Sequence, residues 1–521
     1  MSTALFSTDA LYEAVGRRWT EARAAVSDLA PLLRFRGAGL RGRSRPFAVL
    51  GLALMLAVTV LAAWMPAYFP EGDQRRTDVL SLLPAGLFGV LIIAIISAAA
   101  SGGGRELMPR DQAVAFPISP TTDHLGALLM APLNIAWLLQ SWAMLGAVAY
   151  VGGASAGLIM SQALIVLWLI TATAIAQVVG WGVEWLRRGP GGLWLTRGLM
   201  SLTALVGAYL IAADKFVPLL ENSPTFNVAV ASLQAVSGPS VLYGEVALVL
   251  VLVLFLAVTG GALVARGVSR RPARDVVRLE TSTHQSRPIP AGDISALMRT
   301  DRVGIWRSVP LRRGLGVLAI MPGLVAIAGS LEWDMLTILP GLVASGGALL
   351  FGVNSWCLDG RGALWRDSLP VDPRLVFASR VLVLVEVLLV ATAGTVVLAS
   401  LRAGLPTGGE LAAVASCAVV VVLQVVSASM RWSVRRPFAV DLRSSRATPA
   451  PPLVMVGYSS RLALSTTTVG IFFSVLAHFS WEWSVLCAVP FAMFSAYRLV
   501  RTGSVWADPV VRSHVVATVA S

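Results

Sequence analysis

Long apolar runs separated by short polar segments dominate the chain. The runs approach the roughly 20 residues that a helix needs to cross the hydrocarbon core of a bilayer. Twelve such runs are predicted as membrane-spanning helices: 47–67, 79–100, 125–149, 157–181, 198–213, 245–265, 314–331, 336–357, 376–400, 410–430, 456–478 and 483–500. The pattern predicts an all-α polytopic membrane protein of about 12 transmembrane helices.

Two polar interruptions share a spacing of prolines. The segment 105–124 contains Pro117-Ile-Ser-Pro120, and the segment 359–374 contains Pro370-Val-Asp-Pro373. Because proline ends helical structure and restricts the residue before it, each segment is interpreted as a short helix that turns sharply into the next span. Two such rigid turns suit a docking surface for a partner with two-fold symmetry. The alternative is a pair of ordinary loops with helix-stop prolines.

Charge indicates the orientation. The chain is 56% hydrophobic and 13% charged, whereas soluble proteins carry roughly a quarter charged residues. The net charge of +13 comes almost entirely from arginines, which are concentrated in every second loop between the predicted spans. This distribution follows the positive-inside rule better than it indicates nucleic-acid binding. It predicts cytoplasmic termini, cytoplasmic interruptions and a multi-pass protein of the cytoplasmic membrane, and the Arg, Ala, Gly and Val usage is typical of a GC-rich bacterium.

Three local similarities recur in the same order in both halves. They pair Arg43–Pro46 with Arg307–Pro310, Pro117–Pro120 with Pro370–Pro373, and Gln177 and Trp185 with Gln424 and Trp432. Six spans in each half then predict a parallel repeat about an axis along the membrane normal.

The repeat defines five predicted regions. They are an amphipathic, cytoplasmic or interfacial N-terminal segment 1–46, a first six-helix half 47–265, a basic cytoplasmic linker 266–313, a second six-helix half 314–500 and a cytoplasmic tail 501–521. The linker ends in a short interfacial helix at 296–306, and the outside loop contains an apolar stretch at 226–236 that can form a re-entrant helix.

The chain shows no catalytic or metal-binding signature. Its single lysine, Lys215, lies in a predicted outside loop, so no phosphate-binding loop of the G-x-x-x-x-G-K-[ST] type is present. The three cysteines and four histidines have no metal-ligand spacing. Within the spans, Glu386 is the one deep carboxylate, and Asn134 falls near the same position of the first half. Each is either a substrate-path residue or a structural hydrogen-bonding group.

A family resemblance rests on the segment from Gly352 to Val371, GVNSWCLDGRGALWRDSLPV. It resembles the region between the second and third spans of type-2 ABC exporter permeases, which often have an Asp-Gly-x-Gly segment followed by a Leu-Pro-Val/Ile-Ser-like turn. Shorter stretches are similar to the same family: Arg105–Leu107, Phe116–Ser119, Leu297–Arg302 and Arg307–Arg313.

The resemblance implies that two permease units are fused in one chain, which is itself not an enzyme. Two copies of a separate ABC ATPase would dock on the interruptions and hold ATP and Mg²⁺, with no cofactor in this chain. The implied coupling residues are Arg105, Glu106, Asp111, Pro117, Pro120, Asp359, Arg366, Asp367, Pro370, Asp372 and Pro373. The cargo would be an amphiphilic or hydrophobic drug, antibiotic or lipid-like molecule passing Asn134 and Glu386. The family also implies a re-entrant segment between the fifth and sixth spans of each half, but 479–482 is too short for one.

Two other classes remain open. An ion-gradient-driven secondary transporter can also have a six-plus-six helix plan, and Glu386 would then titrate during transport. A membrane-embedded transferase would need acidic or histidine residues clustered at one membrane face, and the sequence shows no convincing cluster.

Overall fold

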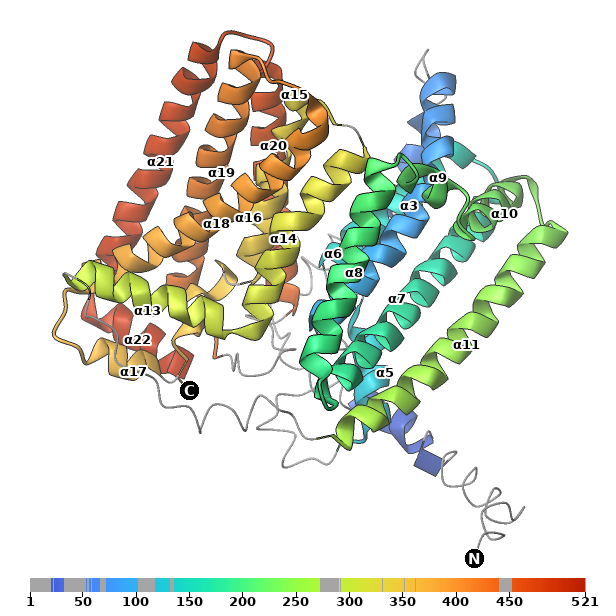
Figure 1. Cartoon of the computed structure of the whole chain (residues 1–521), viewed down its shortest axis with the longest axis horizontal. Helices are drawn as coiled ribbons and strands as arrows, with labels where there is room; N and C mark the ends of the chain where they lie inside the picture. Colours follow the sequence, from blue (N-terminus) through green and yellow to red (C-terminus); the bar gives the residue numbers. More distant parts are fainter. Residues whose placement is uncertain are drawn as a thin grey trace, which may run out of the picture. The chain divides into compact units, whose positions relative to one another are not determined.

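The computed structural model describes most of the chain as helices joined by turns (Figure 1). The described residues are parts of 20–65, then 72–101, 118–131, 135–271, 290, 292–329, 331–350, 352–360, 362–439 and 452–520. These ranges contain α-helices and one 3-10 segment but no β-strand. The predicted all-α class is therefore confirmed for the described part of the chain. By compactness the chain divides into unit 1, Met1–Ser282, and unit 2, Thr283–Ser521, a division that falls inside the predicted linker.

Seven helices among the described residues are long and apolar enough to cross a membrane. They are Val79–Ala99, Leu158–Arg188, Val241–Ser269, Trp333–Leu350, Pro373–Ala403, Gly408–Arg435 and Trp481–Ala507. Each overlaps a predicted span, and a bent pair over 293–327 raises the number to eight if it counts as one span. An apolar run of this length folds as a helix because lipid offers no partner to an exposed backbone N–H or C=O group. The polytopic helical character is confirmed, whereas the predicted span 47–67 lies largely outside the described residues.

Unit 1 is organised around α7 (Leu158–Arg188), whose buried face includes Leu164, Ile165 and Ala172. Trp168 of this helix donates its indole N–H to the carbonyl of Leu87 at 3.2 Å. The helices around α7 are α3 (Gly72–Ser101), α5 (Pro120–Met130), α6 (Ile135–Gly152), α8 (Gly192–Ala212), α10 (Thr225–Ser237) and α11 (Val241–Ser269). A six-residue helix, α9 (Phe216–Glu221), precedes α10. The apolar stretch predicted at 226–236 is thus a helix, α10, with one face buried against α7 and α3.

Unit 2 is organised around α19 (Gly408–Arg435). This helix starts with a capping box between Thr407 and Glu410, and Val421 and Val425 are fully buried in its middle. It packs on α16 (Leu339–Leu350), α18 (Pro373–Ala403), α20 (Pro452–Leu476) and α21 (Trp481–Ala507), and α14 (Val309–Ala328) lies along α18. The helix α21 follows α20 after a turn of about four residues, so the second half has no counterpart of α10 there.

Two predicted spans are not single helices. The span predicted at 336–357 covers α16, which together with the short α15 (Trp333–Leu336) forms one candidate span, and also the 3-10 segment η4 (Gly352–Leu358). Asn354 in η4 has φ −148° and ψ 74°, and its side chain donates to the carbonyl of Phe438 at 2.6 Å. This side-chain bond stabilises a non-helical backbone that an apolar run does not predict. The span predicted at 125–149 covers parts of α5 and α6, and residues 132–134 between them lie outside the described residues.

Three short helices lie at one end of unit 2 (Figure 1). The helix α13 (Asp293–Arg307) covers the predicted helix 296–306 and meets the following helix, Leu311–Ile327, at 83°. The helices α17 (Gly362–Asp367) and α22 (Pro509–Ala520) pack on each other. The predicted tail 501–521 therefore contains the end of α21 and a helix that covers the second proline-containing interruption.

Candidate functional site

A network of ion pairs joins four elements at this end of unit 2. Arg366 of α17 donates from Nη1 to Oδ1 of Asp301 at 2.6 Å and from Nη2 to Oδ2 at 3.2 Å. Arg380 of α18 donates from Nη2 to both carboxylate oxygens of Asp359 at 2.7 and 2.8 Å. The two pairs are cross-linked, by Arg366 to Asp359 at 3.1 Å and by Arg380 to Asp301 at 3.0 Å. Two guanidinium groups and two carboxylates thus form one neutral cluster, which we call the α17 network.

The α17 network is buried. Asp301 of α13 is 3% exposed and Arg380 is 0% exposed, so their charges are stable only because each is paired and hydrogen-bonded. Ser379 adds a link, accepting from Arg366 at 3.2 Å and donating to Asp301 at 3.0 Å. Burial by itself would raise the pKa of Asp301, but the charges of Arg380 and Arg366 and these hydrogen bonds outweigh it and hold that pKa below its usual range. Burial would lower the pKa of Arg366, but its hydrogen bonds to Asp301 and Asp359 and the negative charges of both carboxylates outweigh burial and raise that pKa.

Local backbone features place the four charges. On α13, Asp301 shares the buried face with Leu297 and Ile305, four residues away on either side. The non-helical backbone of η4 directs the carbonyl of Ser355 to Nη1 of Arg380, at 2.6 Å. Gly360 has φ 48°, a left-handed conformation that glycine adopts at low cost, and it lets the chain turn from Asp359 into α17.

Two stacked tryptophans lie next to the α17 network. The rings of Trp356 in η4 and Trp506 in α21 lie 3.9 Å apart and within 7° of parallel. The indole N–H of Trp506 donates to the carbonyl of Pro373 at 3.2 Å, which ties α21 to the start of α18. Arg380 lies over the ring of Trp356 at 5.2 Å. The start of α18 is therefore held by both the ion pairs and the aromatic stack.

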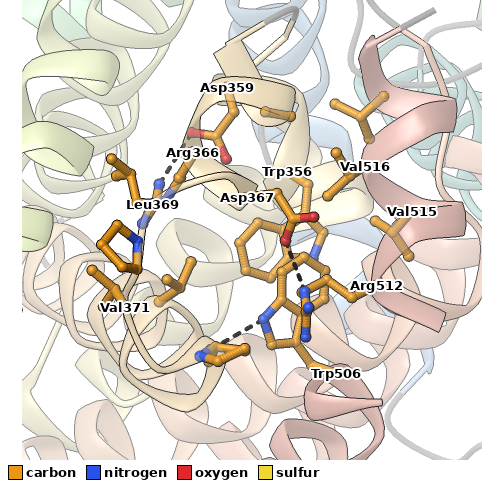
Figure 2. Close-up of a pocket in the computed structure, with 15 residues that line it drawn as sticks. Trp356, Asp359, Arg366, Asp367, Leu369, Val371, Trp506, Arg512, Val515 and Val516 are labelled. Carbon is orange, nitrogen blue, oxygen red and sulfur yellow. Dashed lines mark hydrogen bonds and ion pairs between the residues drawn. The ribbon is translucent and has the colours of Figure 1, made fainter. Parts of the chain in front are cut away.

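A cavity of about 280 Å³ lies beside the stack (Figure 2). Asp367 and Arg512 form an ion pair at its wall, with 2.7 Å between Oδ1 and Nε, and this pair fastens α22 to α17. Besides the two tryptophans and Ala363, the apolar lining comes from the interruption, the start of α18 and α22: Leu369, Pro370, Val371, Pro373, Val376, Val515, Val516 and Val519.

The outer face of α17 is apolar and exposed. Leu364 is 58% exposed and Trp365 is 66% exposed, whereas Ala363 and Arg366 on the same helix are buried. A helix of six residues thus buries an arginine on one side and presents a large aromatic ring on the other. Two adjacent exposed apolar side chains of this size are a candidate contact surface for protein or lipid.

The predicted residues of the second interruption lie close together in the structure, in the α17 network, at the start of α18 and around the cavity. Asp359 and Arg366 belong to the α17 network, and Asp367 pairs with Arg512. Asp372 caps α18 by accepting from the backbone N–H of Arg374 at 2.8 Å. Pro370 and Pro373 line the cavity.

The predicted residues of the first interruption are mostly outside the described residues. This holds for Arg105, Glu106, Asp111 and Pro117, and also for the path residue Asn134. Pro120 is described and begins α5, which Ser119 caps through the backbone N–H of Thr122 at 3.0 Å. Pro120 and Pro373 therefore occupy the same position of a helix, each after a capping side chain.

Glu386 lies on the side of α18 that faces α13. Its carboxylate accepts from Nε of Arg302 on α13 at 2.9 Å, and both side chains are about two-fifths exposed. The described contacts place Glu386 against α13.

Sequence reasoning missed Asp301, Ser379, Arg380, Trp356 and Trp506 as members of the site. A signal was present for Arg380, because an arginine inside the predicted span 376–400 needs a partner in the protein. The partners could not be identified, since Asp301 is 79 positions earlier in the sequence (380 − 301).

Groups of three or more His, Cys, Asp or Glu side chains that could hold a metal are absent from the described residues. Comparison with protein families, with curated proteins and with solved structures found no match for the chain.

Proposed function

We propose that the chain is the membrane-spanning permease subunit of an ATP-driven exporter of the type-2 ABC class. In this proposal a separate ATPase docks on α17, and its closure on ATP moves the helices that surround the transport path. The cargo is an amphiphilic or hydrophobic small molecule, and the protein is a multi-pass component of the cytoplasmic membrane. The observation that carries the proposal is the construction of α17.

The construction of α17 suits the transmission of force. Its outer face offers Leu364 and Trp365 to a partner, and its inner face is anchored by Arg366. Through Asp301 and Asp359 the anchor reaches α13, η4 and α18. A buried network in which each charge has an opposite partner resists separation, because each broken pair leaves an uncompensated charge. A push on α17 is therefore passed to α18, one of the candidate spans.

Similar local features in the two units support a six-plus-six plan of about twelve spans. Pro120 and Pro373 begin α5 and α18 behind the caps Ser119 and Asp372. The matched residues Gln177 and Gln424 are alike as well, since each has a buried side-chain oxygen with no hydrogen-bond donor among the described residues. The helices that carry them, α7 and α19, have 31 and 28 residues and both end in arginines. In this plan a second ATPase docks on the first interruption, and both termini are cytoplasmic.

A copurification experiment tests the docking surface. The tagged full chain is expressed in its native host and purified in mild detergent, and bound proteins are identified together with any ATP hydrolysis. We expect an ABC ATPase at two copies per chain and vanadate-sensitive hydrolysis. The variant Trp365→Glu should lose both, because a charge replaces an exposed apolar contact.

A matched control is Trp481→Glu. Trp481 is 54% exposed and begins α21. It lies at the opposite end of the helix from Trp506, which lines the same cavity as Ala363 and Arg366 of α17. This variant should keep the ATPase. Equal retention of the ATPase by both variants would contradict docking on α17, and transport by the purified chain without any ATPase would contradict the proposed class.

A gradient-driven carrier is the second candidate. The favouring observation is the ion pair of Glu386 with Arg302, which places an ionisable carboxylate on a candidate span. In that case transport in sealed vesicles would stop when a protonophore collapses the gradient, and it would need no ATP.

A further inference from the structure

Five arginines from three helices of unit 2 form what we call the arginine cluster. Arg431 and Arg435 lie one turn apart on α19, and Arg498 and Arg501 lie one turn apart on α21. The fifth, Arg461, belongs to α20. The positive charges of Arg435, Arg461 and Arg501 repel that of Arg431, and Arg498 is repelled in the same way by the arginines of α19 and α20.

Packing among the three helices brings the cluster together. The hydroxyl groups of Ser429 on α19 and Tyr458 on α20 are 2.6 Å apart, and the ring of Trp432 lies 5.3 Å from that of Tyr458. Arg461 follows Tyr458 by one turn. The helices α19 and α21 start at the same end, since Gly409 lies against the backbone of Phe479. Their arginine-bearing turns are therefore at the same end as well.

The cluster lacks a counter-charge in the described part of the chain. None of its arginines forms an ion pair with a described carboxylate, although the α17 network nearby pairs every charge. Nε of Arg498 is buried without an acceptor, and so is the indole N–H of Trp432. A buried donor without an acceptor is costly, as is the crowding of like charges. Both observations point to an anion with several acceptor oxygens.

The segment that joins α19 to α20 contains too few acidic residues to neutralise the arginine cluster. In the sequence, residues 436–451 contain Arg436, Arg443 and Arg446 but a single acidic residue, Asp441. The segment therefore adds net positive charge to the end of the bundle.

We propose that the arginine cluster binds the phosphate group of an anionic phospholipid. Guanidinium groups donate in a planar fork that fits two phosphate oxygens, and basic sites between membrane helices bind acidic headgroups. The surface next to the cluster suits the rest of a lipid, since Phe494 and Tyr497 on α21 are about 60% exposed. A soluble phosphate ester offers the same oxygens, so the test separates the two sources.

The test uses the full chain in detergent and in vesicles. Retained lipid is counted by native mass spectrometry after exchange into an equimolar mixture of phosphatidylcholine and phosphatidylglycerol. We expect retention of phosphatidylglycerol over phosphatidylcholine, and a higher unfolding temperature in the mixture than in phosphatidylcholine alone. The double variant Arg431→Gln/Arg498→Gln should bind phosphatidylglycerol about tenfold more weakly, which corresponds to the loss of charge-assisted hydrogen bonds.

Two further variants keep the result interpretable. Arg270→Gln/Arg307→Gln removes the same charge from exposed arginines outside the cluster and should retain the lipid. Arg431→Lys/Arg498→Lys preserves charge and should bind with intermediate affinity, which distinguishes lost binding from a folding defect. Stabilisation by inorganic phosphate alone would assign the site to a soluble phosphate ester and overturn the lipid assignment. Equal lipid retention by the two glutamine double variants would overturn the site itself. Lipid binding that appears only in Asp441→Asn would also overturn it, because Asp441 would then be the counter-charge of the cluster in the wild-type chain.

Discussion

Arg366 and Asp301 form a two-point ion pair across 65 positions of sequence, with donor–acceptor distances of 2.6 and 3.2 Å. The pair joins α17, in the second proline-containing interruption, to α13, the helix that leads into unit 2. Because both side chains are buried, the pair connects these elements more rigidly than a surface contact would. The interruption is therefore an integral part of the helical bundle.

Replacing the acid tests this connection. Asp301→Asn leaves Arg366 and Arg380 with one carboxylate between them, so we expect a loss of about 3–5 kcal/mol of stability. The measurement is the unfolding midpoint of the full chain in mild detergent. The neighbouring pair Arg302–Glu386 is more exposed, so Glu386→Gln should cost about 1 kcal/mol or less. Equal losses for the two variants would contradict the structural role of the network.

The stability of the chain should depend on pH through Asp301. Its pKa is held below the usual range in the folded chain, so the unfolded chain takes up the proton first as the solution is acidified. The stabilisation is complete above the unfolded pKa of about 3.9 and is lost as the pH falls through the folded pKa. We expect the difference in unfolding temperature between wild type and Asp301→Asn to be constant near neutrality and to shrink below about pH 4. A difference that grows on acidification would contradict the assigned sign.

The helix α22 should depend on the pair of Asp367 with Arg512. This pair is partly exposed, so Arg512→Gln should cost about 0.2–1 kcal/mol and leave the overall unfolding temperature nearly unchanged. Hydrogen exchange at α22 should nevertheless become faster, because the helix loses an anchor to α17. The exchanged pair Asp367→Arg/Arg512→Asp should restore protection. Unchanged exchange in the single variant would show that the valines of α22 hold it without the ion pair.

A side chain at Gly157, the residue that precedes α7, should destabilise the fold. A Cβ atom at Gly157 would collide with the backbone carbonyl oxygens of Ala235 and Val236 at the end of α10. We expect Gly157→Ala to destabilise unit 1 by roughly 1–3 kcal/mol, as overpacking does. The control is Gly182→Ala within α7, where the new methyl group meets no atom within 4 Å. This control should be neutral or stabilising by up to about 1 kcal/mol, because alanine favours the helix. Similar destabilisation by both variants would contradict the close contact between α7 and α10.

The discriminating test between the two transport classes also involves Glu386. An ATP-driven exporter should keep its transport in Glu386→Gln, since the side chain forms a partly exposed ion pair with Arg302 of α13. A proton-coupled carrier would lose transport or its pH dependence in this variant. The measurement is substrate efflux from sealed vesicles with ATP or with a proton gradient as the energy source.

The sequence by itself determined the helical membrane character of the protein. An apolar run of membrane length has few alternatives to a helix, because every backbone group must be satisfied within the segment. For this reason seven predicted spans coincide with candidate membrane helices, and the helix predicted at 296–306 is present as part of α13. Capping residues and prolines also act locally, and α5 and α18 begin at Pro120 and Pro373 behind the caps Ser119 and Asp372.

Only the tertiary structure decided how the polar residues are used. Hydropathy predicted one helix over 336–357, but in η4 the side chain of Asn354 and the backbone N–H of Ser355 donate to distant partners, and the backbone is not helical there. Arg366, predicted as a docking residue, is buried because Asp301 lies across from it, whereas Trp365 beside it is exposed. The sign of a charge and its spacing along the chain do not reveal its partner, since ion pairs form between residues that folding brings together. The assignment of an inner and an outer face to α17 therefore had to come from the packing of α13, α18, α21 and α22 around it.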